Sequence, residues 1–285
     1  MDENLNEMIK KYSPSFRIVQ PPKANKSEIT KAKAVFGKKE WAPYSENCVV
    51  GCAHDCRYCY AKADAIRHKR TRPQQWKNEV VRTEMLQKEF RKRNGRIMFP
   101  SSHDIAPIHL SECLTFLKNI LNPGNEVLIV TKPHLECVKA IGEDFSWSKE
   151  KILFRFTIGS SNSNTLKFWE PNAPDFAERL ESLKYACDQG FQTSVSCEPM
   201  LDIHVGDVIQ QVSPFVTDTI WLGLANLLPS RLRLNAETAE ATRAMAAQLM
   251  KEQSKEFIWV LYSQYKDNPQ IRWKESIKKI IGFDK

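Results

Sequence analysis

Residues 48–59 read CVVGCAHDCRYC and place four of the eight cysteines of the chain in twelve positions. A structural zinc ion usually takes its ligands from two short segments that lie apart in the chain, whereas all four of these thiols share one loop. Three thiolates from such a loop can instead hold three corners of a cubic iron–sulfur cluster. The spacing of Cys52, Cys56 and Cys59 favours the cluster and leaves Cys48 as an additional thiol.

Short apolar runs alternate with amphipathic stretches after residue 95. This alternation is typical of a parallel sheet with helical crossovers, either closed into a barrel or left as an open α/β sheet. The segment 176–190 is predicted to be a helix that ends at Gly190. The expected strands lie within 96–100, 126–133, 151–159, 191–201 and 218–227, a further helix lies at 236–253, and a last apolar run lies at 256–262.

Polar residues follow the apolar part of four predicted strands. They are SSHD at 101–104, TK at 131–132, TIGSS at 157–161 and SCEP at 196–199. In β/α barrels the active site lies at the carboxyl ends of the strands, where these groups would meet. Each group alone is an ordinary turn, but four at equivalent places predict a site.

The composition favours a cytoplasmic protein that does not span a membrane. No apolar run approaches the ~20 residues that cross a bilayer, and the acidic N-terminus lacks the features of a signal peptide. In a reducing compartment, clustered thiols are metal ligands more often than disulfides. Lys and Arg exceed Asp and Glu by 42 − 34 = 8. This excess, concentrated at 23–39, 67–72 and 91–93, indicates either a nucleic-acid partner or a solvated basic face.

The predicted organisation has three parts. Residues 1–40 form an N-terminal basic arm or cap, residues 41–230 form the core, and residues 231–285 supply a C-terminal helix, an apolar run and a tail that pack on the core. Residues 74–93 are predicted to form an amphipathic helix with a basic end. No pattern in the sequence predicts the oligomeric state.

The motif C-x-x-x-C-x-aromatic-C at 52–59 resembles that of the radical S-adenosyl-L-methionine (SAM) enzymes, and further segments resemble the spore photoproduct lyase-like branch. These are SEITK at 27–31, WAPYSENCVVGCAHDCRYCYA at 41–61 and FWEPNAPDFAERLESLKYACDQGF at 168–191. The resemblance implies an α/β fold, a partial (β/α)6-type TIM barrel. Ala42 and Cys197-Glu198-Pro199 depart from the pattern of that branch, which favours a substrate other than a thymine dimer.

The resemblance also implies the cofactors. Cys52, Cys56 and Cys59 would hold a 4Fe-4S cluster whose open iron binds SAM, and one electron would cleave SAM to a 5′-deoxyadenosyl radical that abstracts hydrogen from the substrate. A reductant such as flavodoxin or ferredoxin is implied as partner. By the same resemblance, Tyr58 would lie against the adenine, Ser101, Ser102 and Asp104 would meet the methionine amino group, Lys132 the carboxylate, and Thr157 and Ser160 the ribose.

Several alternatives remain open from the sequence. Ser101, Ser102 and Asp104 also suit turns or helix caps, and Lys132 suits a solvated turn. Cys197 and Cys48 compete as hydrogen donors to a substrate radical. His54 either donates a hydrogen bond to a sulfide and so tunes the reduction potential of the cluster, or is a solvated loop residue. The substrate is a nucleic-acid lesion or modified nucleoside, or else a peptide or small metabolite, and a zinc-stabilised nucleic-acid-binding module is the non-catalytic alternative.

Overall fold

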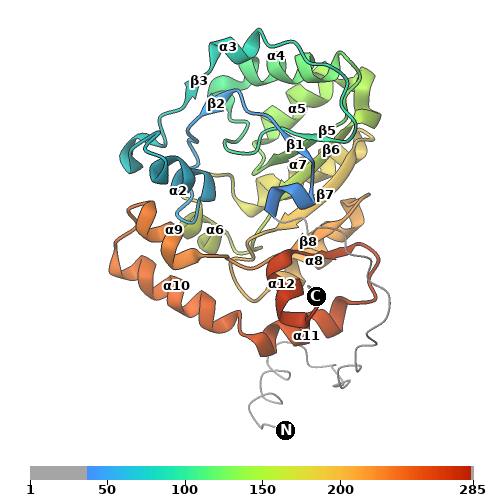
Figure 1. The fold of residues 1–285 in the computed structure, drawn as a ribbon. Coiled ribbons are helices and arrows are strands. Elements are labelled where there is room, and N and C mark those ends of the chain that lie inside the picture. Colours follow the sequence, from blue (N-terminus) through green and yellow to red (C-terminus); the bar gives the residue numbers. More distant parts are fainter. Residues whose placement is uncertain (1–36, 284–285) are drawn as a thin grey trace.

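The computed structural model describes residues 37–283 and shows an α/β half-barrel (Figure 1). Seven strands, all parallel, lie in the order β1-β4-β5-β6-β7-β8-β9. The predicted partial barrel is confirmed, with one strand more than the six expected. The strands are β1 (Tyr44–Ser45), β4 (Ile97–Met98), β5 (Val127–Thr131), β6 (Ile152–Thr157), β7 (Gln192–Cys197), β8 (Ile220–Leu222) and β9 (Ile271–Trp273).

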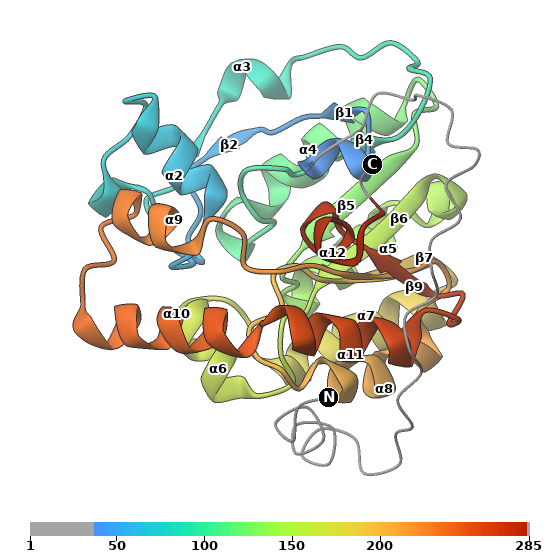
Figure 2. The same ribbon diagram turned by 60° about the horizontal axis from the view of Figure 1, so that its bottom comes forward.

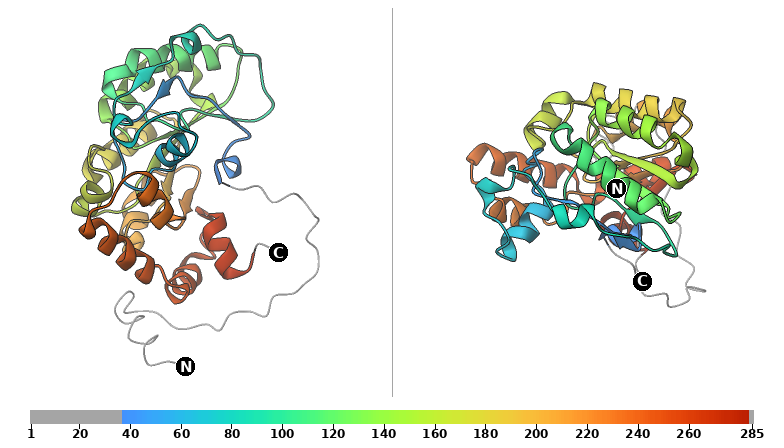
Figure 3. Two further views of the ribbon diagram at one scale, coloured as in Figure 1. Left: turned by 60° about the vertical axis from the view of Figure 1, so that its left-hand side comes forward. Right: turned by 90° about the horizontal axis from the view of Figure 1, so that it is seen from above.

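Helices cover the convex face of this sheet, and Figure 3 shows the green and yellow ones lined up along that side. The predicted helix at 176–190 is present, and Gly190 follows it with φ +78°, a conformation that glycine adopts without strain. The helices between strands are α2 (Tyr60–Arg67), α4 (Leu110–Leu121), α5 (Leu135–Asp144), α6 (Ser163–Trp169), α7 (Phe176–Asp188), α8 (Val205–Val212), α9 (Leu228–Leu234), α10 (Glu240–Glu252) and α11 (Lys255–Tyr265). Short 3-10 turns lie at Pro107–His109, Ser146–Lys151 and Ser213–Phe215.

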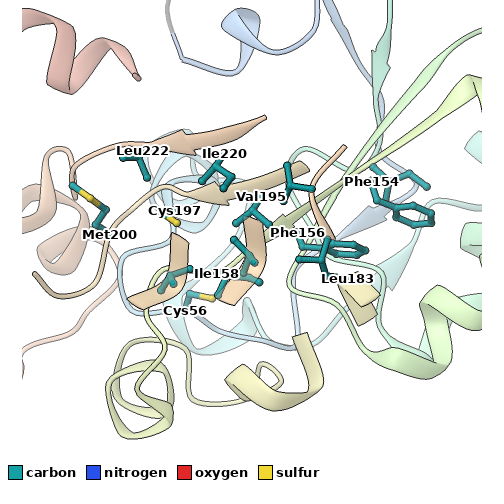
Figure 4. Close-up of a cluster of buried hydrophobic side chains, with 14 of the residues drawn as sticks. Cys56, Phe154, Phe156, Ile158, Leu183, Val195, Cys197, Met200, Ile220 and Leu222 are labelled. Atoms are coloured by element: carbon teal, nitrogen blue, oxygen red, sulfur yellow. The ribbon is translucent and has the colours of Figure 1, made fainter. Parts of the chain in front are cut away.

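The side chains of strand β6 point alternately to the two faces of the sheet. Phe154 and Phe156 point into the main core beneath the helices, where Val195 and Leu183 also lie (Figure 4). Leu153 instead packs with Met98 on the inner, concave face. Successive side chains of a strand point to opposite faces, so the next inward residues are Arg155 and Thr157.

The concave face is closed by the segment that precedes β1. The turn η1 (Gly37–Glu40) lies beside α12 (Glu275–Ile281), as Figure 2 shows. The Nζ atom of Lys274, which directly follows β9, is 2.6 Å from the carboxylate of Glu40. Trp41 packs edge-on against Trp221 of β8. The two edge strands of the open sheet are thereby linked across the concave side.

One sequence prediction is wrong, and one strand was not predicted. Residues 74–93 are not one helix: they contain the end of a 3-10 turn η2 (Pro73–Gln75), strand β3 (Val80–Val81) and one helical turn α3 (Thr83–Leu86). The β-branched pair in β3 pairs antiparallel with β2 (Val49–Val50), beside the cysteine loop. The final strand was also missed, because the apolar run at 256–262 lies in helix α11 and β9 follows it.

The predicted N-terminal arm lies outside the described residues, apart from its last four positions. Among residues 37–283, no helix combines the length and apolar character that a membrane crossing requires.

Candidate active site

A cavity of about 370 Å³ lies at the carboxyl ends of the strands. Strands β4 to β9 all contribute to its wall, as expected for a β/α barrel site. The residues that follow these strands and line the cavity are Ser101, Ser102, His103 and Asp104 after β4, Thr131 and Lys132 at β5, Thr157 at β6, Glu198 and Pro199 after β7, Leu224 and Asn226 after β8, and Lys274 after β9.

The three thiols of the motif face this cavity. Cys52, Cys56 and Cys59 all line it, and burial raises the pKa of each thiol above its ordinary value. After burial, the nearby Asp104 and the thiols of Cys56 and Cys59 raise the pKa of Cys52 further. Within residues 37–283, no three His, Cys, Asp or Glu side chains are grouped as ligands of one metal ion.

This donor set fits an iron–sulfur cluster. Thiolates are the ligands such clusters take, and a bound metal keeps a thiol deprotonated despite burial. Cys48 stands apart from the three: its thiol is fully buried, lies 3.9 Å from the thiol of Cys113 and does not line the cavity. The sequence therefore identified the three residues that could hold the group, and the structure places them on one wall.

The backbone of the cysteine loop is held by neighbouring segments. The N–H of Cys52 donates to the carbonyl of Trp76 at 2.9 Å. Gly51, with φ +94°, lies so close that a Cβ atom would come within 2.6 Å of that same carbonyl. On the other side, the side-chain amide of Asn235 donates to the carbonyls of Arg57 and Cys59. Hydrogen bonds to the backbone of the loop therefore hold it from both sides.

Behind the loop lies a buried charge network. The Tyr58 hydroxyl donates to the carboxylate of Glu170, which pairs with Arg179 at 2.5 Å and lies 3.9 Å from the Nζ atom of Lys132. Burial alone would raise the pKa of Glu170, but the two cations outweigh it and hold that pKa below its ordinary value. Arg179 also donates to the carbonyl of Thr157 at 3.0 Å. One ion pair thus connects the cysteine loop to strands β5 and β6.

A second network surrounds Asp104. Its carboxylate accepts from the N–H of Lys132 at 2.9 Å and from the hydroxyl of Thr131, and it lies 3.3 Å from Nδ1 of His54. The ring of His54 in turn meets that of His134 at 3.0 Å. Burial raises the pKa of Asp104, but His54, Lys132 and Thr131 together lower it below the usual carboxyl range. His54 is buried, so the solvated-loop interpretation of this histidine is wrong.

The remaining predicted site residues divide into two groups. Tyr58, Ser101, Ser102, Asp104, Lys132 and Thr157 line the cavity. Ser160 does not: it is fully buried, and its hydroxyl donates to Asp202. Cys197 is also fully buried away from the cavity lining. The structure thus brings neither candidate hydrogen donor, Cys197 nor Cys48, to the cavity.

Sequence reasoning missed Glu170 and Arg179 as site residues. Both lie in the segment 168–191 that resembles the lyase branch, and that resemblance was the available signal. It did not reveal that the two residues would pair with each other and with Tyr58.

The sheet has the partial-barrel fold of the spore photoproduct lyases. A spore photoproduct lyase variant with bound AdoMet and dinucleoside spore photoproduct superposes with a TM-score of 0.54 at 15% identity, covering 85% of this chain and 79% of that one. A spore photoproduct lyase complexed with dinucleoside spore photoproduct gives a TM-score of 0.53 at 14% identity, with the same coverage.

The chain belongs to the family of the uncharacterised protein MJ0683 of Methanocaldococcus jannaschii. The two are 30% identical over 220 residues, which cover 73% of this chain and 81% of that protein. The uncharacterised protein ORF301 of Acidianus two-tailed virus is 25% identical over 213 residues, or 68% of each chain. No family model matches the sequence.

Proposed function

We propose that the protein is a radical SAM enzyme in which Cys52, Cys56 and Cys59 hold a 4Fe-4S cluster and the adjoining cavity binds SAM. The observation that carries the proposal is that the three thiols face one cavity together with the polar ends of the strands. When bound, the cluster would supply one electron to cleave SAM to a 5′-deoxyadenosyl radical, which would abstract hydrogen from the substrate.

The residues of the chain would fix and shield this chemistry. The Glu170–Arg179 pair holds the hydroxyl of Tyr58, so the ring is presented to the cavity in one orientation. Lys132 lies 5.9 Å above that ring and offers a positive charge at the end of β5. We infer that Lys132 meets the SAM carboxylate, Tyr58 the adenine and Thr157 the ribose. Cys56 is buried, whereas Cys52 and Cys59 are partly accessible from the cavity in which SAM would lie.

We further infer that the substrate is a nucleic-acid lesion or a modified nucleoside. The basic stretch at 91–93 is engaged within the protein, since Arg93 pairs with Glu46 at 3.0 Å. The stretch at 67–72 differs, because Arg67, Lys69 and Arg72 are exposed and form no ion pair within the described part of the chain. Helix α2 carries this stretch from the cavity wall, where Ala61 lies, to the surface. A polyanion could be attracted there.

The electron would come from a small reductant such as flavodoxin or ferredoxin in a cytoplasmic setting. A peptide or small metabolite is the second candidate substrate. Salt dependence separates the two, because release of counterions makes nucleic-acid binding fall steeply with added salt. Equal binding at low and high salt would contradict the nucleic-acid assignment.

The central experiment is anaerobic reconstitution of the full-length protein with iron and sulfide. One cubane per chain is expected in the parent, loss of the cluster in Cys56→Ala, and retention in Cys187→Ala, whose thiol lies on helix α7 outside the cavity lining. The reduced protein with SAM should then form 5′-deoxyadenosine. Stoichiometric zinc without iron–sulfur absorption would contradict the cluster and favour the zinc-binding alternative. A cluster without 5′-deoxyadenosine would contradict the radical chemistry alone.

A further inference from the structure

The cations that line the cavity differ in whether a carboxylate accompanies them. Lys132 lies 3.9 Å from Glu170, and Lys274 pairs with Glu40 at 2.6 Å and with Glu198 at 3.5 Å. Lys38 and Arg231 also line the cavity, but neither forms an ion pair with any residue between 37 and 283. The cavity therefore contains two positive charges that the described protein does not neutralise.

Arg231 comes from helix α9, in the part of the chain that resembles the lyase branch only in its strand–helix rhythm. Its side chain is half-buried, and burial is the main cause that lowers its pKa. Arg231 lines the cavity together with Cys59 and Tyr60 of the cysteine loop region and Glu198 after β7. No hydrogen bond of the side chain is formed within the described residues.

Lys38 approaches the same part of the cavity from the turn η1. Its Nζ atom donates to the Ser101 hydroxyl at 3.5 Å. The hydroxyl of Tyr60 donates to the carbonyl of the same serine. Lys38, Tyr60, Ser101 and Arg231 all line the one cavity, as do the aromatic side chains of Trp41 and Trp76.

We propose that Arg231 and Lys38 form a substrate subsite that binds an oxyanion, a phosphate or a carboxylate, while the aromatic wall contacts the apolar part of the same molecule. The proposal rests on the proposed function in taking this cavity as the active site. A half-buried guanidinium without a partner costs stability, and an incoming oxyanion would supply the missing acceptors in a bidentate geometry. Both carboxylates that line the cavity are engaged within the protein: Glu198 pairs with Lys274 at 3.5 Å, and Asp104 accepts from the N–H of Lys132 and lies 3.3 Å from His54.

The test is direct binding of small anions to the full-length protein as purified, after its metal content has been measured. Inorganic phosphate and, separately, acetate are titrated by calorimetry. We expect R231Q and K38Q each to weaken binding of the anion by about tenfold, the effect of losing one charge-assisted hydrogen bond. R231K should retain part of the affinity. Binding of phosphate alone, or of acetate as well, tells which oxyanion the subsite accepts.

Matched controls are available on the same elements. Arg233 is exposed on α9 and Lys39 is exposed on η1, and neither lines the cavity, so R233Q and K39Q should bind like the parent. Thermal unfolding of each variant checks the fold. Since Arg231 has no partner among residues 37–283, R231Q should unfold at the temperature of the parent or above it, and R231K provides a second folded variant.

Three results would overturn the subsite. The first is that neither anion binds, and the second is that R231Q and R233Q bind the anion with equal affinity. The third is a tenfold loss of SAM affinity in the reconstituted R231Q protein with phosphate binding unchanged. The last result would assign Arg231 to the carboxylate of SAM. Anion binding does not require the cluster. Anion binding without formation of 5′-deoxyadenosine would therefore support the subsite and contradict the proposed function. Formation of 5′-deoxyadenosine without anion binding would support the proposed function and contradict the subsite.

Discussion

The hydroxyl of Tyr58 donates a hydrogen bond to the carboxylate of Glu170, 112 residues further along the chain. Tyr58 lies between two thiols of the motif, and Glu170 is fully buried at the end of helix α6. The second oxygen of the carboxylate faces Arg179. The position of the cysteine loop therefore depends on an ion pair that belongs to a different pair of helices.

Replacement of Glu170 by Gln should destabilise the protein strongly. The change leaves the fully buried Arg179 without its counter-charge, which typically costs about 3–5 kcal/mol. Tyr58→Phe removes only a hydrogen bond to a charged group and should cost about 1.5–3 kcal/mol. Denaturant unfolding measures both. Glu181→Gln, on the exposed side of α7, should be neutral, and an equally neutral Glu170→Gln would show that the pair does not stabilise the fold.

Asp104 should make the stability depend on acid pH. Its pKa is lowered in the folded protein, so its contribution is present above the unfolded carboxyl pKa, about 4, and is lost as pH falls through that value toward the folded pKa. Asp104→Asn should therefore be less stable than the parent at pH 7, with a difference that shrinks on acidification. The measurement is the free energy of unfolding from pH 7 down to pH 3.

The exposed Asp144→Asn provides the comparison for this titration. A difference between the Asp104 variant and the parent that stays constant with pH would show that the amide loses packing rather than charge.

Gly159 should not accept a side chain. A Cβ atom would lie 2.5 Å from the carbonyl of Pro199, where the ends of β6 and β7 approach each other. Because backbone atoms cannot move aside cheaply, Gly159→Ala should cost about 1–3 kcal/mol. Gly206→Ala in helix α8 meets only the hydroxyl of Tyr265 at 3.2 Å and should stay within about 1 kcal/mol of the parent. Equal melting temperatures would contradict the close approach.

Lys274 should matter more for stability than its neighbour Lys278. Lys274 is 3% exposed and bridges Glu40 and Glu198, so Lys274→Met leaves Glu198 without its ion pair and Glu40 with Lys278 alone, at a cost of about 3 kcal/mol. Lys278 is 35% exposed and meets Glu40 at 3.2 Å, and Lys278→Met should cost no more than about 1 kcal/mol. Thermal unfolding ranks the two, and the reverse order would contradict the assignment.

Much of the fold follows from local sequence pattern. Strands β4 to β8 lie within the predicted segments. Apolar residues dominate β4, β5, β6 and β8, whereas β7 (QTSVSC) is marked mainly by its β-branched residues and by the polar residues at its carboxyl end. β9 was missed, since Ile271–Trp273 is short and follows an apolar run of helical periodicity in α11. The helix predicted at 74–93 is absent because Val80 and Val81 pair with Val50 and Val49 of β2, which precede them by 80 − 50 = 30 and 81 − 49 = 32 positions.

The site was predictable where one segment of sequence holds the signal. The spacing of the thiols marks the loop, and six of the seven contacts implied by the resemblance line the cavity: Tyr58 from that loop and five residues from the strand ends. Arg231 carries no such local signal. Arg231 is proposed as an anion ligand because it has no ion-pair partner within residues 37–283. The absence of a partner depends on where the tertiary structure places every acidic side chain, which the local sequence does not reveal.

The contact between η1 and the residue after β9 also determines when, during synthesis, the first described segment can reach its final position. Gly37 and Lys274 are 237 residues apart, yet the lysine donates to the carbonyl of that glycine. The first described segment can therefore reach its final position only after nearly the whole chain has left the ribosome. Until then the concave face with its cysteine loop is open at one side, and metal delivery before this contact forms would meet an accessible site.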